Sequence, residues 1–370
     1  MNRNEVRMSK KKVVIVGGGY VGFEVAKELE AYADITVIEQ RKAFVLPPAA
    51  IRALVQPELL DEIILPYDNL LKHGKVVRGR AVSVAQSEVI LASGEVVPAD
   101  FIVVATGSSY AAPFKPSGES IADFRQASSE ISAQLRKAKS IAIVGAGAVG
   151  TELAGEVASA QPEKSITLIS SDETLFPMYP ARMGAQLKRK LEQLGVTVIL
   201  GQRAKDLRHL DRPYEGSVTL TDGRNIEADL IFPVVGSKAQ STLLESLPGV
   251  THGSSGRVKT DKWLRPSDYP NIFVAGDVAE VGDGMTIVAT TRQNPWLIKT
   301  LKKVLEGAAP ESLRPYSPWK KAPILLPLGP VIGNSWIFAT LGDRGTRMMK
   351  GRDLFIPKYR KAFGLKYRGI

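Results

Sequence analysis

A glycine motif placed directly behind a run of β-branched residues constrains this chain more than any other feature. Residues 13–16 read Val-Val-Ile-Val and lead into Gly-x-Gly-x-x-Gly at residues 17–22, after which residues 23–30 have the composition of a helix. A strand, a tight glycine turn and a helix in this order are typical of a βαβ unit whose helix N-terminus faces a pyrophosphate. A second apolar run, residues 35–38, ends in Glu39, which lies 22 residues after the first glycine and can accept hydrogen bonds from a ribose. The stretch therefore predicts a dinucleotide-binding site.

The same pattern occurs again 128 residues further along the chain. Residues 141–144 read Ile-Ala-Ile-Val and precede a second Gly-x-Gly-x-x-Gly at residues 145–150. In both copies a hairpin turn and an apolar run follow, and that run ends in glycine: Gly107 lies 90 residues after the first motif begins, and Gly236 lies 91 residues after the second begins. Each copy predicts a βαβ unit, a short β-meander and a buried strand. A repeat of this length indicates two dinucleotide-binding modules.

The last third of the chain predicts a smaller set of elements. Residues 272–277 form a short apolar run that ends in Gly-Asp, and residues 290–306 predict a helix. Two strand-like segments follow at residues 324–328 and 336–341, ahead of a basic tail. We therefore expect an α/β fold with two Rossmann-like domains and a small C-terminal α+β segment.

The net charge of +11 is concentrated at the two ends of the chain. Residues 1–12 carry five Lys/Arg against one Glu, and residues 343–370 carry nine Lys/Arg against two Asp, so the remainder is neutral overall. The tail mixes apolar and basic side chains, which leaves two interpretations open: a membrane-surface anchor, or a solvated segment packed across the domain interface. Basic tails also bind phosphate backbones, but no nucleic-acid recognition motif accompanies this one. With no signal-peptide-like start and no run of about 18 apolar residues, we expect a cytoplasmic protein, with peripheral membrane contact as the alternative.

The sequence contains no cysteine. This excludes disulfides, thiolate metal sites, cysteine nucleophiles and redox-active dithiols. The three histidines, His73, His209 and His252, are too widely spaced to suggest a metal site or a catalytic triad, so no bound metal is expected.

Four motifs together resemble the flavoproteins that contain two dinucleotide-binding domains. They are the glycine motif at residues 17–22, Ala-Thr-Gly at 105–107, the second glycine motif with Glu152, and Ala-Gly-Asp at 275–277, and their order matches that family over about residues 13–307. The resemblance implies FAD in the first module and NAD(P)H in a second module inserted into it. Members of the glutathione-reductase type need a cysteine pair beside the flavin, which this chain lacks. The implied domains are an N-terminal extension (1–12), a discontinuous FAD domain (13–112 and 257–307), an NAD(P)H domain (113–256) and a C-terminal segment (308–370).

Three short phrases outside the glycine motifs resemble the apoptosis-inducing-factor-like group, and above all its ferroptosis-suppressor branch. They lie at residues 38–44, 162–169 and 350–355. That branch reduces quinones with NAD(P)H, so the resemblance implies hydride transfer from NADH or NADPH to flavin N5, and then electron transfer to a quinone or a similar small acceptor. Two alternatives stay open: an electron donor to a ferredoxin, and a redox-sensing binding protein with slow turnover. A homodimer is also open.

The resemblance assigns roles to particular residues. Glu39 would bind the FAD ribose, Asp277 would hold the ribityl or pyrophosphate region, and Glu152 would lie at the junction of nicotinamide and flavin. Glu152 and Gln293 are the candidate catalytic residues. The candidate cofactor-binding residues are Gly17, Gly18, Gly19, Tyr20, Val21, Gly22, Glu39, Gln40, Arg41, Val82, Ala105, Thr106, Gly107, Gly145, Gly147, Ala148, Val149, Gly150, Gly236, Gly276 and Asp277.

The nicotinamide and quinone contacts are less well specified. The strand expected at residues 165–169 is followed by Ser-Ser and then Asp172, so no acid stands directly at its end, and no Arg or Lys occurs before Arg182. This slightly favours NADH through Asp172, with dual use left open. Type II NADH:quinone reductases carry an Ala-Gln-x-Ala-x-Gln motif near the helix that faces the flavin. The nearest equivalent here, residues 288–293, keeps only its final glutamine, Gln293. It is either a quinone contact or a polar residue near the start of a helix.

Overall fold

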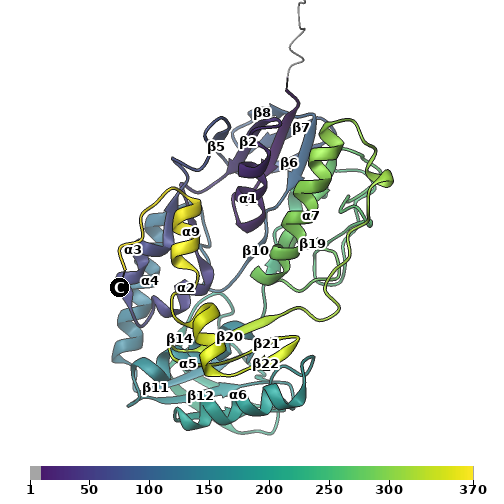
Figure 1. The fold of residues 1–370 in the computed structure, drawn as a ribbon. Coiled ribbons are helices and arrows are strands. Elements are labelled where there is room, and N and C mark those ends of the chain that lie inside the picture. Colours follow the sequence, from purple (N-terminus) through teal and green to yellow (C-terminus); the bar gives the residue numbers. More distant parts are fainter. Residues whose placement is uncertain (1–9, 370) are drawn as a thin grey trace, which may run out of the picture. The chain divides into compact units, whose positions relative to one another are not determined.

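The computed structural model describes residues 10–369, and their contacts form two compact units (Figure 1). Each unit is assembled from three separate stretches of the chain. Unit 1 contains residues up to 42, 66–108 and 238–320. Unit 2 contains residues 43–65, 109–237 and those after 320. Most of the predicted N-terminal extension, residues 1–9, lies outside the described part of the chain. The main difference from the predicted domains is that residues 43–65 and those after 320 belong to the same unit as the second glycine motif. Which unit holds which dinucleotide stays a prediction.

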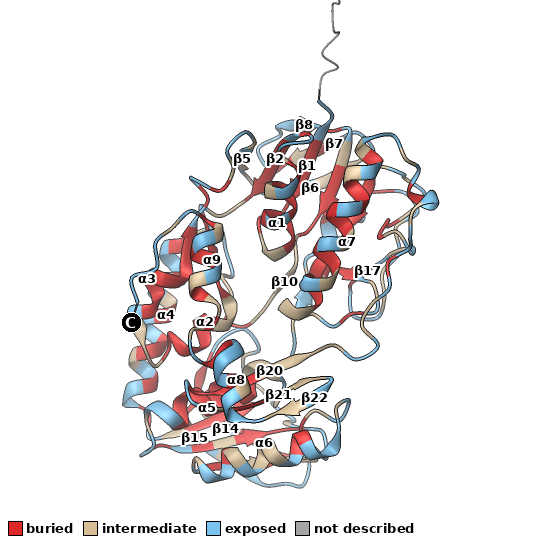
Figure 2. Cartoon of the chain, viewed as in Figure 1, coloured by how far each residue is buried: buried red, intermediate tan, exposed pale blue. Residues whose placement is uncertain are grey.

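A parallel sheet of five strands forms the centre of unit 1, in the order β18-β9-β1-β2-β5. The strands are rich in valine and isoleucine, as expected where a sheet is covered on both faces, and Figure 2 shows their buried residues. The strands predicted at residues 13–16 and 35–38 are confirmed as β1 and β2. The five strands are β1 (Lys12–Val16), β2 (Asp34–Glu39), β5 (Lys75–Arg78), β9 (Phe101–Val104) and β18 (Ile272–Val274).

Two helices pack together on this sheet, α1 (Tyr20–Leu29) and α7 (Ile287–Leu305). Val25 and Leu29 of α1 and Leu301 of α7 are buried in the same core. The predicted helix at residues 290–306 is confirmed and begins three residues earlier. It begins there because the hydroxyl of Thr286 accepts a hydrogen bond from the Ala289 N–H and caps the helix.

The rest of unit 1 consists of short strands and 3-10 turns. An antiparallel sheet carries the hairpin turn predicted for the first copy, and this turn contains Ser93 and Gly94. These elements are β6 (Ala81–Ala85), β7 (Glu88–Leu91), β8 (Val96–Pro98), β16 (Lys238–Ala239), β17 (Val258–Lys259), β19 (Ala279–Glu280), and 3-10 helices at Thr242–Leu244, Gly276–Val278 and Pro310–Ser312. Strand β10 (Ser108–Ser109) spans the point where the chain passes from unit 1 to unit 2.

Unit 2 contains a second five-stranded sheet, in the order β13-β12-β11-β15-β14. All its neighbours are parallel except β14 and β15. The second copy differs from the first in its meander, because β15 is nine residues long and runs from the hairpin turn into the sheet. The elements are α4 (Ile121–Lys137), β11 (Ser140–Val144), α5 (Ala148–Ala160), β12 (Ser165–Ile169), α6 (Ala181–Gln193), β13 (Val196–Ile199), β14 (Tyr214–Thr219) and β15 (Asn225–Pro233). The predicted α/β fold with two Rossmann-like sheets is confirmed.

Two distant segments complete unit 2. The predicted strand at 336–341 is broken at Phe338, whose φ of +61° reverses the chain between β21 and β22. The first segment contains β3 (Ala43–Val45), α2 (Pro47–Arg52), a 3-10 turn (Pro57–Leu59), α3 (Leu60–Ile63) and β4 (Ile64–Pro66). The second contains β20 (Ile324–Leu328), β21 (Ile332–Ile337), β22 (Ala339–Leu341), α8 (Asp343–Thr346), a π-helical turn (Arg347–Gly351) and α9 (Ile356–Ala362).

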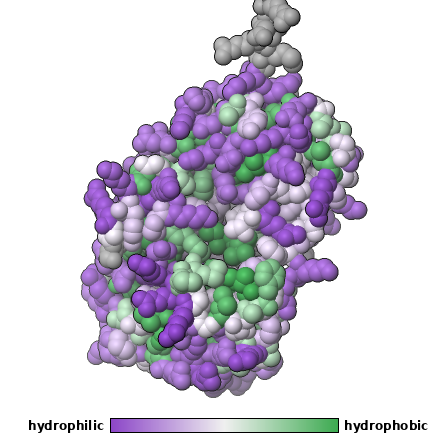
Figure 3. All heavy atoms as spheres, viewed as in Figure 1, coloured by the Kyte–Doolittle hydropathy of each residue, from purple (hydrophilic) through white to green (hydrophobic). Residues whose placement is uncertain are grey.

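The basic tail folds onto the first of these segments. Phe363 is fully buried and stacks on Phe44 with their ring centroids 5.8 Å apart, while Leu354 is also buried. Met348 remains 83% exposed, and hydrophilic side chains cover most of the face drawn in Figure 3. Among residues 10–369, no helix is both long enough and apolar enough to cross a membrane. Membrane contact by the tail stays a prediction.

Candidate functional site

The first glycine turn leaves open space at the start of helix α1. Gly17 has a φ of +101°, and a Cβ built on it would lie 2.5 Å from the Ala105 carbonyl oxygen, so only glycine fits there. At Gly19, by contrast, a Cβ would meet no described atom within 4 Å apart from its chain neighbours and its own helix. Gly19 is also the N-cap of α1 and offers no side chain to its N–H groups. This open cradle at a helix N-terminus fits a pyrophosphate.

The carboxylate of Glu39 is held in a fixed position beside that turn. It is 8% exposed, and its two oxygens accept hydrogen bonds from the Gly18 N–H at 2.9 Å and the Arg41 N–H at 3.0 Å. The Tyr67 hydroxyl donates to the Gly18 carbonyl at 3.0 Å, and burial raises the pKa of Tyr67, which keeps this donor protonated. A carboxylate oriented in this way has lone pairs left for ribose hydroxyls.

The Gly276–Asp277 turn of unit 1 is fixed by residues from several distant parts of the sequence. Gly276 has a φ of +82°, and its N–H donates to the Gln293 side-chain oxygen at 2.7 Å. The Asp277 carboxylate accepts a hydrogen bond from the Ser108 hydroxyl at 2.6 Å, and its backbone carbonyl accepts one from Arg257 Nε at 3.1 Å. The predicted residues of this turn therefore lie next to the end of strand β9.

The second glycine turn repeats the geometry of the first within unit 2. Gly145 has a φ of +112°, and a Cβ there would lie 2.4 Å from the Val234 carbonyl oxygen. At Gly147 a Cβ would again meet no described atom within 4 Å beyond its own neighbours and helix. Gly236 has a φ of +98° and corresponds to Gly107 with +69°. Unit 2 therefore presents a second cradle of the same kind.

The two modules differ at the residue that would face the ribose. Gly17 donates its N–H to the Ile38 carbonyl, and Gly145 donates to the Ile169 carbonyl, so Ser170 takes the place of Glu39. The Ser170 hydroxyl accepts a hydrogen bond from the Asp172 N–H at 3.2 Å. The exposed side chains of Asp172 and Glu173 are the first acids beyond this strand.

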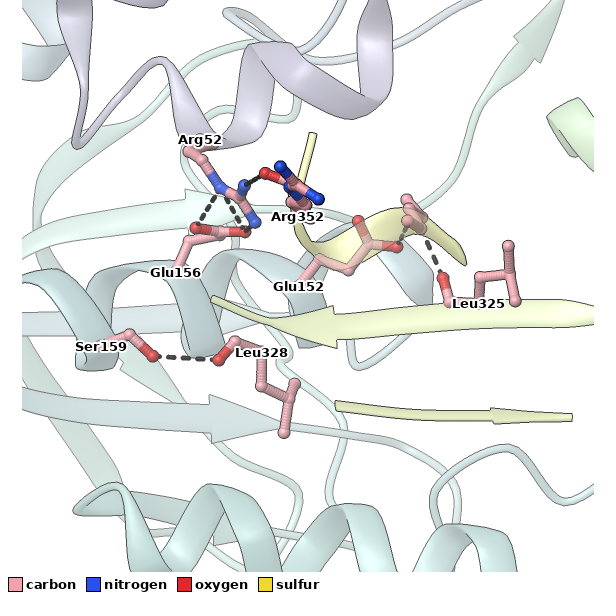
Figure 4. Close-up of polar contacts among 8 residues, drawn as sticks. Arg52, Glu152, Glu156, Ser159, Leu325, Leu328 and Arg352 are labelled. Atoms are coloured by element: carbon pink, nitrogen blue, oxygen red, sulfur yellow. Dashed lines mark hydrogen bonds and ion pairs between the residues drawn. The ribbon is translucent and has the colours of Figure 1, made fainter. Parts of the chain in front are cut away.

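Four charged side chains of unit 2 form two buried ion pairs on helix α5 (Figure 4). Glu152 and Glu156 lie one helical turn apart and are 4% and 3% exposed. Lys350 Nζ lies 2.6 Å from Glu152, and Arg52 binds Glu156 through two nitrogens at 2.7 and 2.9 Å. Burial raises the pKa of Glu152, and Lys350 opposes that shift by stabilising the carboxylate. Each buried carboxylate thus has its own cation.

The sequence reasoning missed three of these four residues. Helix α5 is otherwise uncharged, so two glutamates four positions apart were a signal that two cations had to be found elsewhere. Of the predicted cofactor residues, Val82 is 40% exposed on β6, and Gln40 and Arg41 are half-buried just after β2. The roles predicted for all these residues stay predictions.

Comparison with known proteins places this geometry among oxidoreductases. The sequence profiles described as pyridine nucleotide-disulphide oxidoreductase match residues 12–64 and 66–294. Apoptosis-inducing factor homolog B of Dictyostelium discoideum is 32% identical over 95% of this chain and 96% of its own. Ferroptosis suppressor protein 1 of Taeniopygia guttata is 27% identical over the same shares. Among solved structures, the ferredoxin reductase for the CYP199A2 system of Rhodopseudomonas palustris has a TM-score of 0.63 at 20% identity, covering 84% of this chain and 78% of that one.

Proposed function

Because the chain belongs to the pyridine nucleotide-disulphide oxidoreductase family, we propose that it oxidises NAD(P)H and delivers the electrons to a quinone. Members of this family bind FAD and NAD(P)H, and the chain is an FAD-dependent NAD(P)H oxidoreductase. The observation that carries the proposal is the pair of open glycine cradles in a chain without cysteine. Electrons therefore leave for an external acceptor, and the ferroptosis-suppressor branch that the sequence resembles uses quinones.

In this proposal the protein binds and orients, and the bound FAD supplies the hydride-accepting and electron-donating chemistry. Unit 1 holds FAD through the cradle at Gly19, the carboxylate of Glu39 and the turn at Asp277. Unit 2 holds NAD(P)H through the cradle at Gly147. Glu152, fixed by Lys350, lies at the nicotinamide end of that site. None of these roles requires a protein nucleophile.

The acceptor is tested by anaerobic stopped-flow reduction of the flavin with NADH or NADPH, followed by mixing with a soluble quinone or with ferredoxin. We expect the quinone to reoxidise the flavin at least about tenfold faster than ferredoxin, because the proposed acceptor is a small molecule and not an iron–sulfur protein. Faster reoxidation by ferredoxin would replace the quinone with a protein acceptor. Slow reoxidation by both would favour a redox-sensing role.

The choice of nicotinamide should depend on Asp172. With Ser170 in the place of the ribose-binding acid, Asp172 is the first carboxylate after the strand that can accept a hydrogen bond from the 2′-OH of NADH and repel a 2′-phosphate. We expect Asp172→Ala to shift the ratio of kcat/KM for NADH over NADPH toward NADPH by roughly fivefold, about 1 kcal/mol. Glu163→Ala is the matched control, since this exposed acid lies before β12. An unchanged ratio in the Asp172 variant would remove the residue from this role.

A further inference from the structure

We propose that two neighbouring amides on helix α7, Gln293 and Asn294, are FAD-positioning residues. Each of them fixes one of the chain segments that contribute to the FAD site of unit 1. Gln293 fixes the Gly276–Asp277 turn, and Asn294 fixes the start of helix α1. The inference rests on the assignment of FAD to this unit, and it gives Gln293 a role distinct from quinone contact.

Gln293 bridges the Gly276 backbone to a buried carboxylate. Its side chain is 1% exposed. The amide oxygen accepts the Gly276 N–H at 2.7 Å, and the amide nitrogen donates to Asp283 at 3.2 Å. An amide has one accepting end and one donating end, so the carboxylate of Asp283 dictates which end faces Gly276. Asp283 therefore sets the orientation of the Gln293 amide, and the amide in turn fixes the Gly276 backbone directly before Asp277.

Asp283 is itself held from several sides. It is 3% exposed and accepts hydrogen bonds from the Tyr316 hydroxyl and, at 3.0 Å, from the Trp319 N–H. Burial, together with the hydrogen bond to Asp283, raises the pKa of Tyr316, so the phenol remains a donor. Arg257 donates to the backbone carbonyls of both Asp277, at 3.1 Å, and Asp283, at 2.9 Å. The hydrogen bonds that run from Tyr316 through Asp283 and Gln293 to Gly276 thus form a continuous buried network within unit 1.

Asn294 makes the corresponding connection to the glycine turn. It is fully buried, and its side-chain nitrogen donates to the Tyr20 carbonyl at 3.1 Å and to the Glu24 carboxylate at 2.7 Å. Tyr20 is the first residue of α1 and directly follows Gly19, where the cradle is open. Consecutive residues of a helix point roughly 100° apart, so one helix can reach both segments from adjacent positions.

The engagement of both ends of Gln293 inside unit 1 distinguishes this role from quinone binding. A quinone carbonyl would need an N–H of the amide as a donor; one of the two is already donated to Asp283, and the Gln293 side chain is only 1% exposed, which leaves the other little access to a ligand. Substitution of Gln293 should therefore weaken the binding of FAD directly, and any loss of turnover with the quinone should follow from that weaker binding.

The test first removes the donor from the Gln293–Asp283 contact and then supplies a donor from position 283 instead. Gln293→Glu keeps the acceptor for Gly276 but places two carboxylates against each other. We expect the Kd of the apoprotein for FAD, measured by quenching of flavin fluorescence, to rise at least about tenfold. Asp283→Asn in the same chain restores a donor opposite Glu at position 293, and the double variant should return to within about threefold of the wild-type Kd. Thr291→Val, an exposed position on the same helix, is the control and should leave the Kd unchanged.

Two results would overturn the proposal. One is a wild-type FAD Kd in Gln293→Glu together with a raised KM for the quinone, which would make Gln293 a quinone contact. The other is a double variant no better than either single variant, which would reduce the network to packing. If Gln293→Glu does not fold, as judged by far-UV circular dichroism, Asn294→Ala tests the second link, and an unchanged FAD Kd there contradicts the proposal. Because these measurements use FAD alone, they stand apart from the identity of the electron acceptor.

Discussion

Gly19→Val is expected to give a folded protein that cannot hold FAD. A Cβ at this position meets no described atom of the chain within 4 Å beyond its neighbours and its own helix, so the valine side chain costs the apoprotein little. The same space is where a pyrophosphate would approach the N-terminus of α1. We expect the variant to purify colourless and its FAD affinity to fall at least about 100-fold, or ~2.7 kcal/mol. Absorbance near 450 nm reports the flavin, and far-UV circular dichroism reports the fold.

Two further glycines provide the controls. Gly147→Val has the same open surroundings in unit 2 and should keep its yellow flavin while losing reduction by NAD(P)H. Gly22→Val should fail differently, because a Cβ there would lie 1.8 Å from the Gly17 carbonyl oxygen and the turn itself would have to move. Loss of FAD from the Gly147 variant, with retention in the Gly19 variant, would reverse the assignment of cofactors to the two units.

Lys350→Met is expected to destabilise the fold strongly, in a way that depends on pH. It leaves the 4%-exposed carboxylate of Glu152 without its cation, and removing one partner of a buried pair typically costs about 3–5 kcal/mol. Because burial raises the pKa of Glu152, the variant can protonate this carboxyl at acid pH, where it needs no cation. The deficit in unfolding free energy relative to wild type should therefore be smallest at acid pH and grow as pH rises. Urea denaturation across a pH series measures it.

A second substitution isolates the charge from the packing. Glu152→Gln combined with Lys350→Met removes both charges and should recover more than half of the lost stability and flatten its dependence on pH. Met349→Ala, at a 40%-exposed neighbouring position, should change stability by less than about 0.5 kcal/mol. A double variant as unstable as Lys350→Met alone would mean that Lys350 acts by packing rather than by neutralising Glu152.

Features that depend on neighbouring residues were predictable from the sequence. The glycine turns, the strands around them and helix α7 follow from local composition and from spacing, and the structure confirms them. Spacing alone misleads where element lengths differ. Helix α5 has 13 residues and α1 has 10, so the counterpart of Glu39 is Ser170, which lies 25 residues after its glycine instead of 22. The break at Phe338 was also hidden, because a reversal at a bulky residue leaves no mark in an apolar run.

Features that depend on distant pairing could not be predicted in this way. Lys350 and Glu152 are 198 residues apart, and Arg52 and Glu156 are 104 apart, so nothing local joins them. Gln293 is nearer in sequence to its partners, 17 residues from Gly276 and 10 from Asp283, but neither lies on its own helix, so the helical pattern does not reveal them. A single sequence shows that a buried charge needs a partner, but not which of many lysines and arginines supplies it.

The interleaving of the two units has a consequence for how this protein is made on the ribosome. Unit 1 has all of its chain once residue 320 has emerged, whereas unit 2 still lacks the strands and helices that follow. Until residues 321 onward have emerged, helix α5 cannot pack against β20, and Glu152 lacks its ion-pair partner Lys350. Unit 2 therefore becomes complete only after unit 1, and the nascent chain exposes the apolar surface of unit 2 for longer than that of unit 1. Chaperones that bind nascent chains should meet unit 2 rather than unit 1.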